Sequence, residues 1–591
     1  MKRPRLPGSF HRIRDRISAG IDEFRIHLSR PDALLQLAVL GLVTGVLAGA
    51  VIVLFRLLVE GLLEALLPGE GAENFEAMPF PDRALLPILG ALLLAALFRW
   101  GGRGMTMLGV THVVERMARH QGYLSLRGFM LQFFGAAIAL ISGQSVGREG
   151  PHVFLGAAAG SLMGQRLSLP NNTIRTLVGC GTAAGIAASF NTPLAGVVFA
   201  LEVVMMEYTV GSFIPIILAA VAATTVSNAV LGDAPAFLVP ALETGSLREL
   251  LLVVLLGVAA GALSAVFNEA LQTVAARTRG IAIWWRLLIA GLLMGAIAAV
   301  VPGVMGIGYD TVADALDGRL LAATMAVMLV AKLVATSLAV GLGVPGGMIG
   351  PALFIGAMLG GLISRLALLL PFDIGGQPQV YALLGMGAMM SGSLQAPLAA
   401  LTAMLELTDN PEIILPGMLA VVVSGVTASE LFRKKSLFLS ILQASGRDYS
   451  TNPLQQALRR IGVASVMERN FARIEVTVTT ARAREIMKRN PPYLLIDGPR
   501  GPAWLMPAVE LARHLDSEPD APDDAVVDLA EIPGRRMHVA AVHLQDNMAQ
   551  AFQMLDGSSI EALYVERVTA PGASRIYGVL TEEMVERAYR Y

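Results

Sequence analysis

Apolar stretches follow one another from residue 33 to residue 432, and they constrain the fold of this chain more than any other feature. A helix needs about 20 apolar residues to cross a bilayer. Several of these stretches are shorter, or are cut by glycine and proline at 147–151, 193, 341–351 and 397. Broken helices are tolerated at membrane depth only where they pack in protein or line a cavity. The pattern therefore predicts an all-α polytopic membrane protein of the kind found among transporters and channels.

The last quarter of the chain has a different composition. Over the whole chain 54% of residues are hydrophobic and 15% are charged, whereas soluble domains carry roughly 25% charged residues. Residues 461–591 alone hold 19 acidic and 14 basic side chains, which indicates a water-soluble tail. We expect two small α/β modules at 461–515 and 530–591, with linkers at 446–460 and 516–529. Strands are predicted at 474–478, 493–497, 539–542, 562–565 and 576–580, and helices at 481–489 and 548–555.

Charge places both ends of the chain on the cytoplasmic side. The first 30 residues hold eight Lys or Arg side chains among spaced apolar residues, which predicts an amphipathic helix on the membrane surface over 1–32. Basic residues 433–435 follow the last apolar stretch, and basic flanks favour the cytoplasm. The net charge of −1 excludes a broadly basic nucleic-acid binder. A single cysteine and scattered histidines support neither a disulfide framework nor a metal site. We expect no cofactor and no enzymatic activity.

An internal repeat divides the apolar part into halves at about 33–240 and 248–445. The run Gly150–Ala157 recurs as Gly350–Ala357. Further echoes are Gly179-x-Gly181 with Gly385-x-Gly387, and Pro193 and Glu202 with Pro397 and Glu406. Paired interrupted segments in two halves point to the binding site of a transporter-type fold.

The segment 142–151 is the most informative. Pro151 suits the first turn of a helix over about 152–165, and Gly147 and Gly150 let the backbone approach a small ligand. The free amides and the positive end of that helix would form an anion site. Glu149 is then the anion that fills the site, a gate that competes with a transported anion, or a helix-capping carboxylate.

Gly147-Arg148-Glu149-Gly150-Pro151 resembles the GREGP signature of the CLC family of chloride channels and proton/chloride antiporters. Residues 347–351, 190–202 and 405–410 are similar to further motifs of that family, and the tail resembles its paired CBS modules. The resemblance implies two inverted repeats, a homodimer in membrane lipid, and chloride or another small anion as the partner. It also implies that Glu149 is the gate. The implied anion-binding positions are Gly147, Arg148, Glu149, Gly150, Met348, Ile349, Leu108 and Phe438, with a structural role favoured for Arg148.

Three positions depart from the family pattern. Leu108 stands where the family has a chloride-coordinating serine, and Phe438 replaces a tyrosine whose hydroxyl would contact the central ion. Val203 stands where the antiporters have a proton-transferring glutamate, and valine has no titratable proton. Glu202 and Glu406 are expected to be structural, with Glu207 and Glu115 as lesser candidates for a proton route. Lys332 is expected to be a structural cation.

These departures favour a chloride channel of the cell membrane. The alternatives are a proton-coupled chloride antiporter and a non-transporting membrane sensor. In the tail, Thr581 begins a ribose-binding pattern, but Met584 stands at its acidic position. Adenine nucleotide binding is therefore possible but not favoured.

Overall fold

The computed structural model describes residues 23–30, 33–68, 73–102, 105, 108–233, 247–368, 377–408, 410–447, 453–499, 501–556, 559–570 and 573–590. The chain forms two compact units. One is helical and comprises residues 34–166 and 174–449; the other comprises residues 1–33, 167–173 and 450–591. The predicted N-terminal amphipathic helix lies largely outside the described residues.

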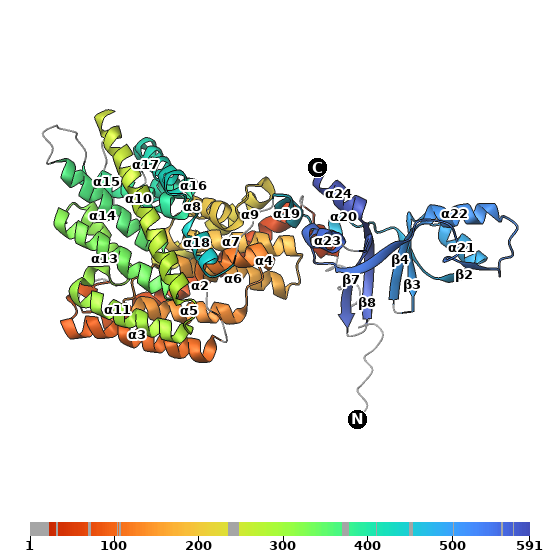
Figure 1. Ribbon diagram of the computed structural model, residues 1–591, viewed down its shortest axis with the longest axis horizontal. Helices are drawn as coiled ribbons and strands as arrows, with labels where there is room; N and C mark the ends of the chain where they lie inside the picture. Colours follow the sequence, from red (N-terminus) through yellow and green to blue (C-terminus); the bar gives the residue numbers. More distant parts are fainter. Residues whose placement is uncertain are drawn as a thin grey trace, which may run out of the picture. The chain divides into compact units, whose positions relative to one another are not determined.

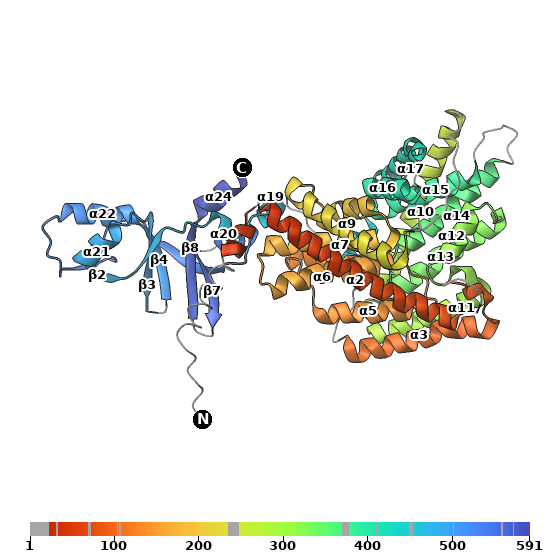
Figure 2. The same cartoon turned by 180° about the vertical axis from the view of Figure 1, so that it is seen from behind.

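The helical unit is a bundle in which eight described helices are long and apolar enough to cross a membrane. Figure 2 shows α2 running diagonally across it beside α9 and α6. Its helices in chain order are α2 (Leu34–Leu66), α3 (Phe80–Gly101), α4 (Gly109–Arg119), α5 (Leu126–Ile141), α6 (Glu149–Arg166), α7 (Asn171–Phe190), α8 (Pro193–Phe199), α9 (Val210–Leu231), α10 (Leu247–Thr278), α11 (Ile283–Val300), α12 (Tyr309–Leu316), α13 (Ala322–Gly341), α14 (Ile349–Ala367), α15 (Pro378–Leu394), α16 (Pro397–Thr408), α17 (Ile414–Val426) and α18 (Leu437–Ala444). Short helical turns complete it: η1 (Phe75–Ala77), η2 (Ala200–Met205), η3 (Pro302–Val304), η4 (Pro411–Ile413) and η5 (Thr427–Leu431).

The two repeats meet at their glycine-rich turns. The turn between α5 and α6 has the same local structure as the turn between α13 and α14. At the meeting point the Gly147 amide donates to the Gly347 carbonyl over 2.8 Å, and the Gly347 amide donates to the Gly147 carbonyl over 2.6 Å. A Cβ atom on Gly150 would lie 2.7 Å from the Cα of Gly347, so only glycine permits this approach. This antiparallel bridge holds the two helix starts, α6 and α14, together.

Glycines also set the packing of the next helix in each repeat. A Cβ on Gly156 would meet the carbonyl of Gly181 at 2.1 Å, and one on Gly356 would meet that of Gly385 at 2.2 Å. Small residues of this kind let membrane helices pack backbone to backbone. The packing therefore equates Gly181 with Gly385, whereas the sequence comparison had equated Gly179 with it. The corrected offset of 204 residues is also that of Pro193 and Pro397.

The second unit contains the α/β tail. It consists of α19 (Pro453–Arg459), α20 (Val463–Val466), β1 (Phe471–Glu475), β2 (Thr477–Thr479), α21 (Thr480–Met487), β3 (Tyr493–Gly498), β4 (Gly501–Pro507), α22 (Ala508–Ser517), β5 (Val526–Asp528), β6 (Met537–His543), α23 (Met548–Leu555), β7 (Ala562–Ala570), β8 (Ala573–Thr581) and α24 (Glu582–Arg590). Six strands form one sheet in the order β1-β3-β4-β6-β7-β8. Each half pairs a parallel neighbour with an antiparallel one, so two βαββα modules share the sheet.

Three expectations about boundaries differ from the structure. The segment 516–529, expected as a linker, contains β5, which pairs antiparallel with β2. The segment 446–460 contains α19, whose Leu458 is fully buried in the tail core. Residues 167–173, assigned from the sequence to the membrane part, belong to the second unit, where the Asn171 side-chain amide donates to Gln550 Oε1 over 2.9 Å. In all three cases the structure depends on burial or on contacts with distant segments. The local composition of a segment does not contain that information.

Candidate anion-binding site

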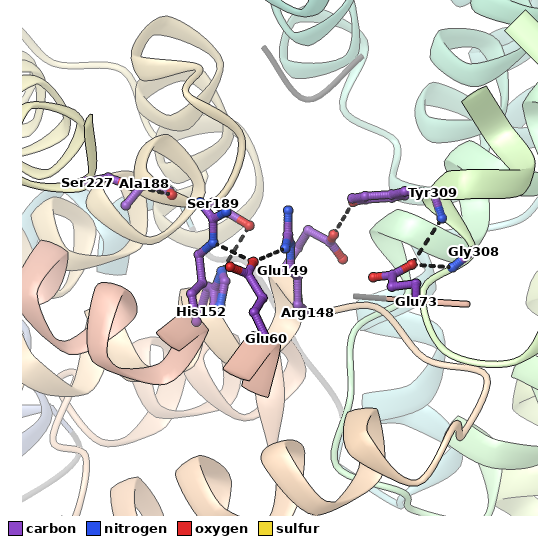
Figure 3. Close-up of polar contacts among 11 residues, drawn as sticks. Glu60, Glu73, Arg148, Glu149, His152, Ala188, Ser189, Ser227, Gly308 and Tyr309 are labelled. Carbon is purple, nitrogen blue, oxygen red and sulfur yellow. Dashed lines mark hydrogen bonds and ion pairs between the residues drawn. The ribbon is translucent and has the colours of Figure 1, made fainter. Parts of the chain in front are cut away.

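Glu149 lies between the two repeats. It is the first residue of α6 and is fully buried. Its Oε2 accepts a hydrogen bond of 3.2 Å from the amide of Gly350, in the first turn of α14. Its Oε1 accepts a hydrogen bond from the hydroxyl of Tyr309, as Figure 3 shows. The carboxylate of the first repeat thus occupies the positive end of a helix of the second repeat. The sequence had placed it at the end of its own helix, which in fact begins at Glu149 itself.

A cavity of about 270 Å³ borders the same helix starts. Five of the eight predicted anion-binding positions line this cavity, and they come from four different parts of the chain: Leu108, Gly150, Met348, Ile349 and Phe438. The cavity wall also includes the turn 343–347 and three arginines that sequence analysis had not singled out: Arg279, Arg286 and Arg447. Glycines and the start of α14 provide backbone amides, and the arginines provide positive charge, so the chemistry of the lining suits a small anion.

The positions of Leu108 and Phe438 leave this cavity without the two hydroxyls of the family pattern. Leu108 caps the N-terminus of α4 and offers no side-chain hydrogen bond. Phe438, in the first turn of α18, is 2% exposed. The Gly109 amide, next to Leu108, donates to Oε1 of the buried Gln132 over 2.8 Å. An anion near α4 therefore finds neither of the two family hydroxyls nor that amide, and Thr111, in the first turn of α4, is the hydroxyl-bearing residue of this helix that lines the cavity.

Arg148 faces away from this cavity. Its Nη1 lies 3.0 Å from Glu60 Oε1, an oxygen that also pairs with Arg56 Nε at 3.0 Å. The guanidinium lies 5.5 Å from the ring centroid of Tyr309. Arg148 lines a separate cavity of about 60 Å³ together with Arg56, Glu60, Glu73 and His152. These contacts hold the Arg148 guanidinium against Glu60 and Tyr309, and its structural role stays a prediction.

Tyr309 is the main residue of the site that sequence analysis missed. It begins α12, and Glu73 Oε2 fixes that helix start by accepting from the amides of Gly308 at 3.1 Å and Tyr309 at 3.2 Å (Figure 3). Lys332 is fully buried and donates to the carbonyls of Val304 at 3.2 Å and Gly306 at 2.9 Å, just before α12. Its neighbours are backbone carbonyls and the ring of Phe354, as expected for a structural cation.

Glu202 and Glu406 each bind the helix start of the opposite repeat. Glu202 accepts from the amides of Leu398 at 3.3 Å and Ala399 at 2.8 Å, at the beginning of α16. Glu406 accepts from the amides of Leu194 at 2.8 Å and Ala195 at 2.7 Å, at the beginning of α8. Both carboxylates therefore cap helices, in reciprocal fashion.

Position 203 and the two lesser candidates for a proton route, Glu115 and Glu207, lie on α4 and in or just after η2. Val203 is 5% exposed within η2, next to Glu202. Glu115 lies on α4, where its Oε2 is 2.6 Å from Arg447 Nη1 and 3.2 Å from His112 Nδ1. Glu207 follows η2 and is 7% exposed. These positions do not by themselves form a chain of titratable groups to Glu149.

Comparison with known proteins shows which protein family the helical unit resembles. Residues 84–429 match the family model described as voltage gated chloride channel. A protein of Ralstonia nicotianae, named for its likeness to the chloride channel ClcB, is 34% identical over 360 residues, which cover 60% of this chain and 83% of that protein. The H⁺/Cl⁻ exchange transporter ClcA of Vibrio vulnificus is 29% identical over 442 residues, which cover 71% of this chain and 92% of that protein. The crystal structure of a slow cyanobacterial Cl⁻/H⁺ antiporter has the same fold, with a TM-score of 0.60 and 23% identity over 70% of this chain and 98% of that chain.

Proposed function

The chain belongs to the voltage gated chloride channel family, the CLC family, and from that premise we propose that it exchanges chloride for protons across the cell membrane. The channel expected from the sequence is not confirmed. Similar proteins bear both channel and exchanger names, and the solved structure of a CLC-type fluoride/proton antiporter is 25% identical to this chain over 69% of its length. The exchanger, which was the alternative, fits these comparisons better.

The position of the Glu149 carboxylate carries the proposal. It is buried on the helix start that borders the chloride cavity, held by Gly350 and Tyr309. A chloride ion that reached this helix end would have to displace the carboxylate, and a displaced carboxylate is free to take up a proton. One side chain would thereby make chloride and proton movement mutually dependent.

A proton path must avoid Val203, because valine has no titratable proton. The small cavity of about 20 Å³ between α7, α8, α14, α15 and α16 does not supply such a path, since its lining is apolar and an apolar cavity of this size stays dry. The proton must therefore reach Glu149 by another route, and Glu202, the acidic residue next to position 203, is the first group to test for it.

Flux from liposomes tests this function. Reconstituted protein in chloride-loaded vesicles should release chloride and take up protons at the same time. Glu149→Gln should still release chloride but should take up no protons, because glutamine cannot carry one. Absence of chloride release by the wild type would favour the non-transporting sensor. Equal proton uptake by both proteins would place the coupling residue elsewhere.

We assign the remaining features on the same premise. The paired βαββα modules act as CBS modules in the cytoplasm, together with the N-terminus. Two copies form a homodimer in the lipid, each with its own chloride path. The CBS pair works without bound adenine nucleotide.

A further inference from the structure

Arg286 is buried, and none of the described residues supplies a counter-charge to it. It lies in the first turn of α11 and is 9% exposed. Its Nη2 donates to the Gly341 carbonyl over 3.0 Å, while its Nε is buried without a hydrogen-bond partner. Among the described residues no carboxylate lies within ion-pair distance of this guanidinium. A buried cation is costly unless it is paired, because its lost hydration is not replaced.

The positive charges of the other two arginines that line this cavity are balanced by an ion pair or solvated by water. Arg447 pairs with Glu115 at 2.6 Å. Arg279 is exposed, so water solvates its charge. Arg286 is the one of these three that is both buried and lacking an acidic partner in the described part of the chain.

The surroundings of Arg286 complete a site for an anion. The cavity that it lines also contains the turn before α14 and the first residues of that helix, Met348 and Ile349. Gly343, in this turn, has φ +95°, and a Cβ there would lie 3.3 Å from Arg286 Nη2. A glycine at 343 therefore lets the guanidinium lie against the turn. Positive charge from the side chain and from the helix end converges on a cavity in which Leu108 and Phe438 supply no donor.

We propose that Arg286 forms a subsite for a small monovalent anion in this cavity, in place of the two missing hydroxyls. The proposal rests on the proposed function for the identity of the anion as chloride. It adds a ligand group that lies on α11, outside every motif of the two repeats. The bound anion would supply the counter-charge that the protein does not.

Chloride-dependent thermal unfolding of the full-length protein in detergent tests the subsite. A ligand that binds only the folded state raises the unfolding temperature with its concentration. Chloride would be titrated against gluconate at constant ionic strength for the wild type, Arg286→Met, Arg286→Gln and the control Arg277→Met, which changes an exposed arginine in the last turn of α10 outside the cavity lining. We expect the apparent affinity for chloride to fall about tenfold or more in both Arg286 variants, since a charged hydrogen-bond partner is lost. Arg277→Met should match the wild type.

Each other result overturns the proposal. A wild type whose unfolding temperature ignores chloride has no such site. A folded Arg286 variant with wild-type chloride dependence shows that the anion does not bind there. An equal loss in Arg277→Met shows general attraction by positive surface charge. If both Arg286 variants fail to fold, Arg286→Lys should retain chloride dependence with weaker affinity, and unchanged affinity would refute a guanidinium-specific contact. Chloride flux in liposomes separates the two ideas: a wild type that binds chloride but moves none contradicts the proposed function and leaves the subsite standing.

Discussion

At the scale of single residues, the site is organised around one carboxylate that behaves as a tethered anion. Glu149 receives one amide and one hydroxyl hydrogen bond. A transported chloride ion would use the same helix end. The side chain is fully buried, and its neighbour in the chain, Gly150, lines the adjacent cavity.

The charge of Glu149 should give the flux its pH dependence. Protonation removes the negative charge that competes with chloride, so wild-type chloride flux should rise as the pH falls. Glu149→Gln should flatten this profile and hold the flux near its acidic maximum. Chloride efflux from liposomes at a series of pH values measures it, and a variant with the wild-type profile would place the gate elsewhere.

Tyr309 should hold the gate in its closed position. Tyr309→Phe removes the hydroxyl that donates to Glu149, and a hydrogen bond to a charged group contributes about 1.5–3 kcal/mol. Chloride flux at neutral pH should therefore rise, by roughly tenfold or more. Combining the change with Glu149→Gln should give no further rise; an additive effect would mean that Tyr309 acts on something other than this carboxylate.

The apolar residues of the cavity predict weak chloride binding near α4 and α18. Phe438→Tyr would return a hydroxyl donor to the cavity, and it should tighten chloride binding by about tenfold as measured by calorimetry. Phe438→Leu, which adds no donor, is the matched control. Equal tightening by both variants would attribute the change to packing and not to the hydroxyl.

At the scale of elements, the repeats hold each other in place through their helix ends. The turns at Gly147 and Gly347 exchange two backbone hydrogen bonds. Glu202 and Glu406 then cap α16 and α8 across the repeat boundary. The symmetry of this pair provides an internal control, because both carboxylates make the same contacts while Glu202 alone adjoins position 203.

The two capping glutamates should differ in function but not in stability. Glu202→Gln and Glu406→Gln should each lower the free energy of unfolding by about 1–2 kcal/mol, because each loses a charged cap on a helix start. If protons enter beside Glu202, its variant should also lower the number of protons moved per chloride, whereas Glu406→Gln should not. Unequal stabilities, or equal loss of coupling, would contradict this division of roles.

Local sequence signals predicted the elements that have local causes. The Gly-Pro turn predicted a helix from about residue 152, three residues after the observed start of α6, and the helices predicted at 481–489 and 548–555 match α21 and α23 closely. Strand β4 was missed because Gly501, Pro502 and Pro507 are residues that strands disfavour. Strand β5 lies in an acidic stretch and is fixed by pairing with β2, a contact that the local pattern does not contain.

At the scale of the whole molecule, local sequence patterns likewise predicted only the part of the site that has a local cause. Motifs predicted Glu149 and the start of α14, because backbone-determined sites leave glycine and proline in the sequence. No motif in the sequence identified Tyr309, Glu73 or Arg286 as residues of the site. They act through contacts between segments far apart in the chain, and their roles emerge only when the fold brings those segments together.

The tail should not bind adenine nucleotides. A cavity of about 470 Å³ includes Thr581, where a ribose would be expected, but its walls also carry Glu561, Glu582, Glu583 and Glu586 against one arginine, Arg535, which pairs with Glu561 at 3.4 Å. Four carboxylates oppose the phosphates of a nucleotide. Calorimetry with ATP and the full-length protein should therefore show no binding at micromolar concentrations; saturable binding there would contradict this account of the tail.

The most direct measurement of the central claim is proton movement driven by chloride alone. Purified protein would be reconstituted into liposomes with high internal chloride and an interior more acidic than the exterior, and internal pH would be followed as chloride leaves. Exchange predicts that protons enter against their gradient, and that an inward chloride gradient reverses their direction. Chloride efflux with no uphill proton entry, together with a reversal potential that follows chloride and ignores pH, would show a channel and contradict the account.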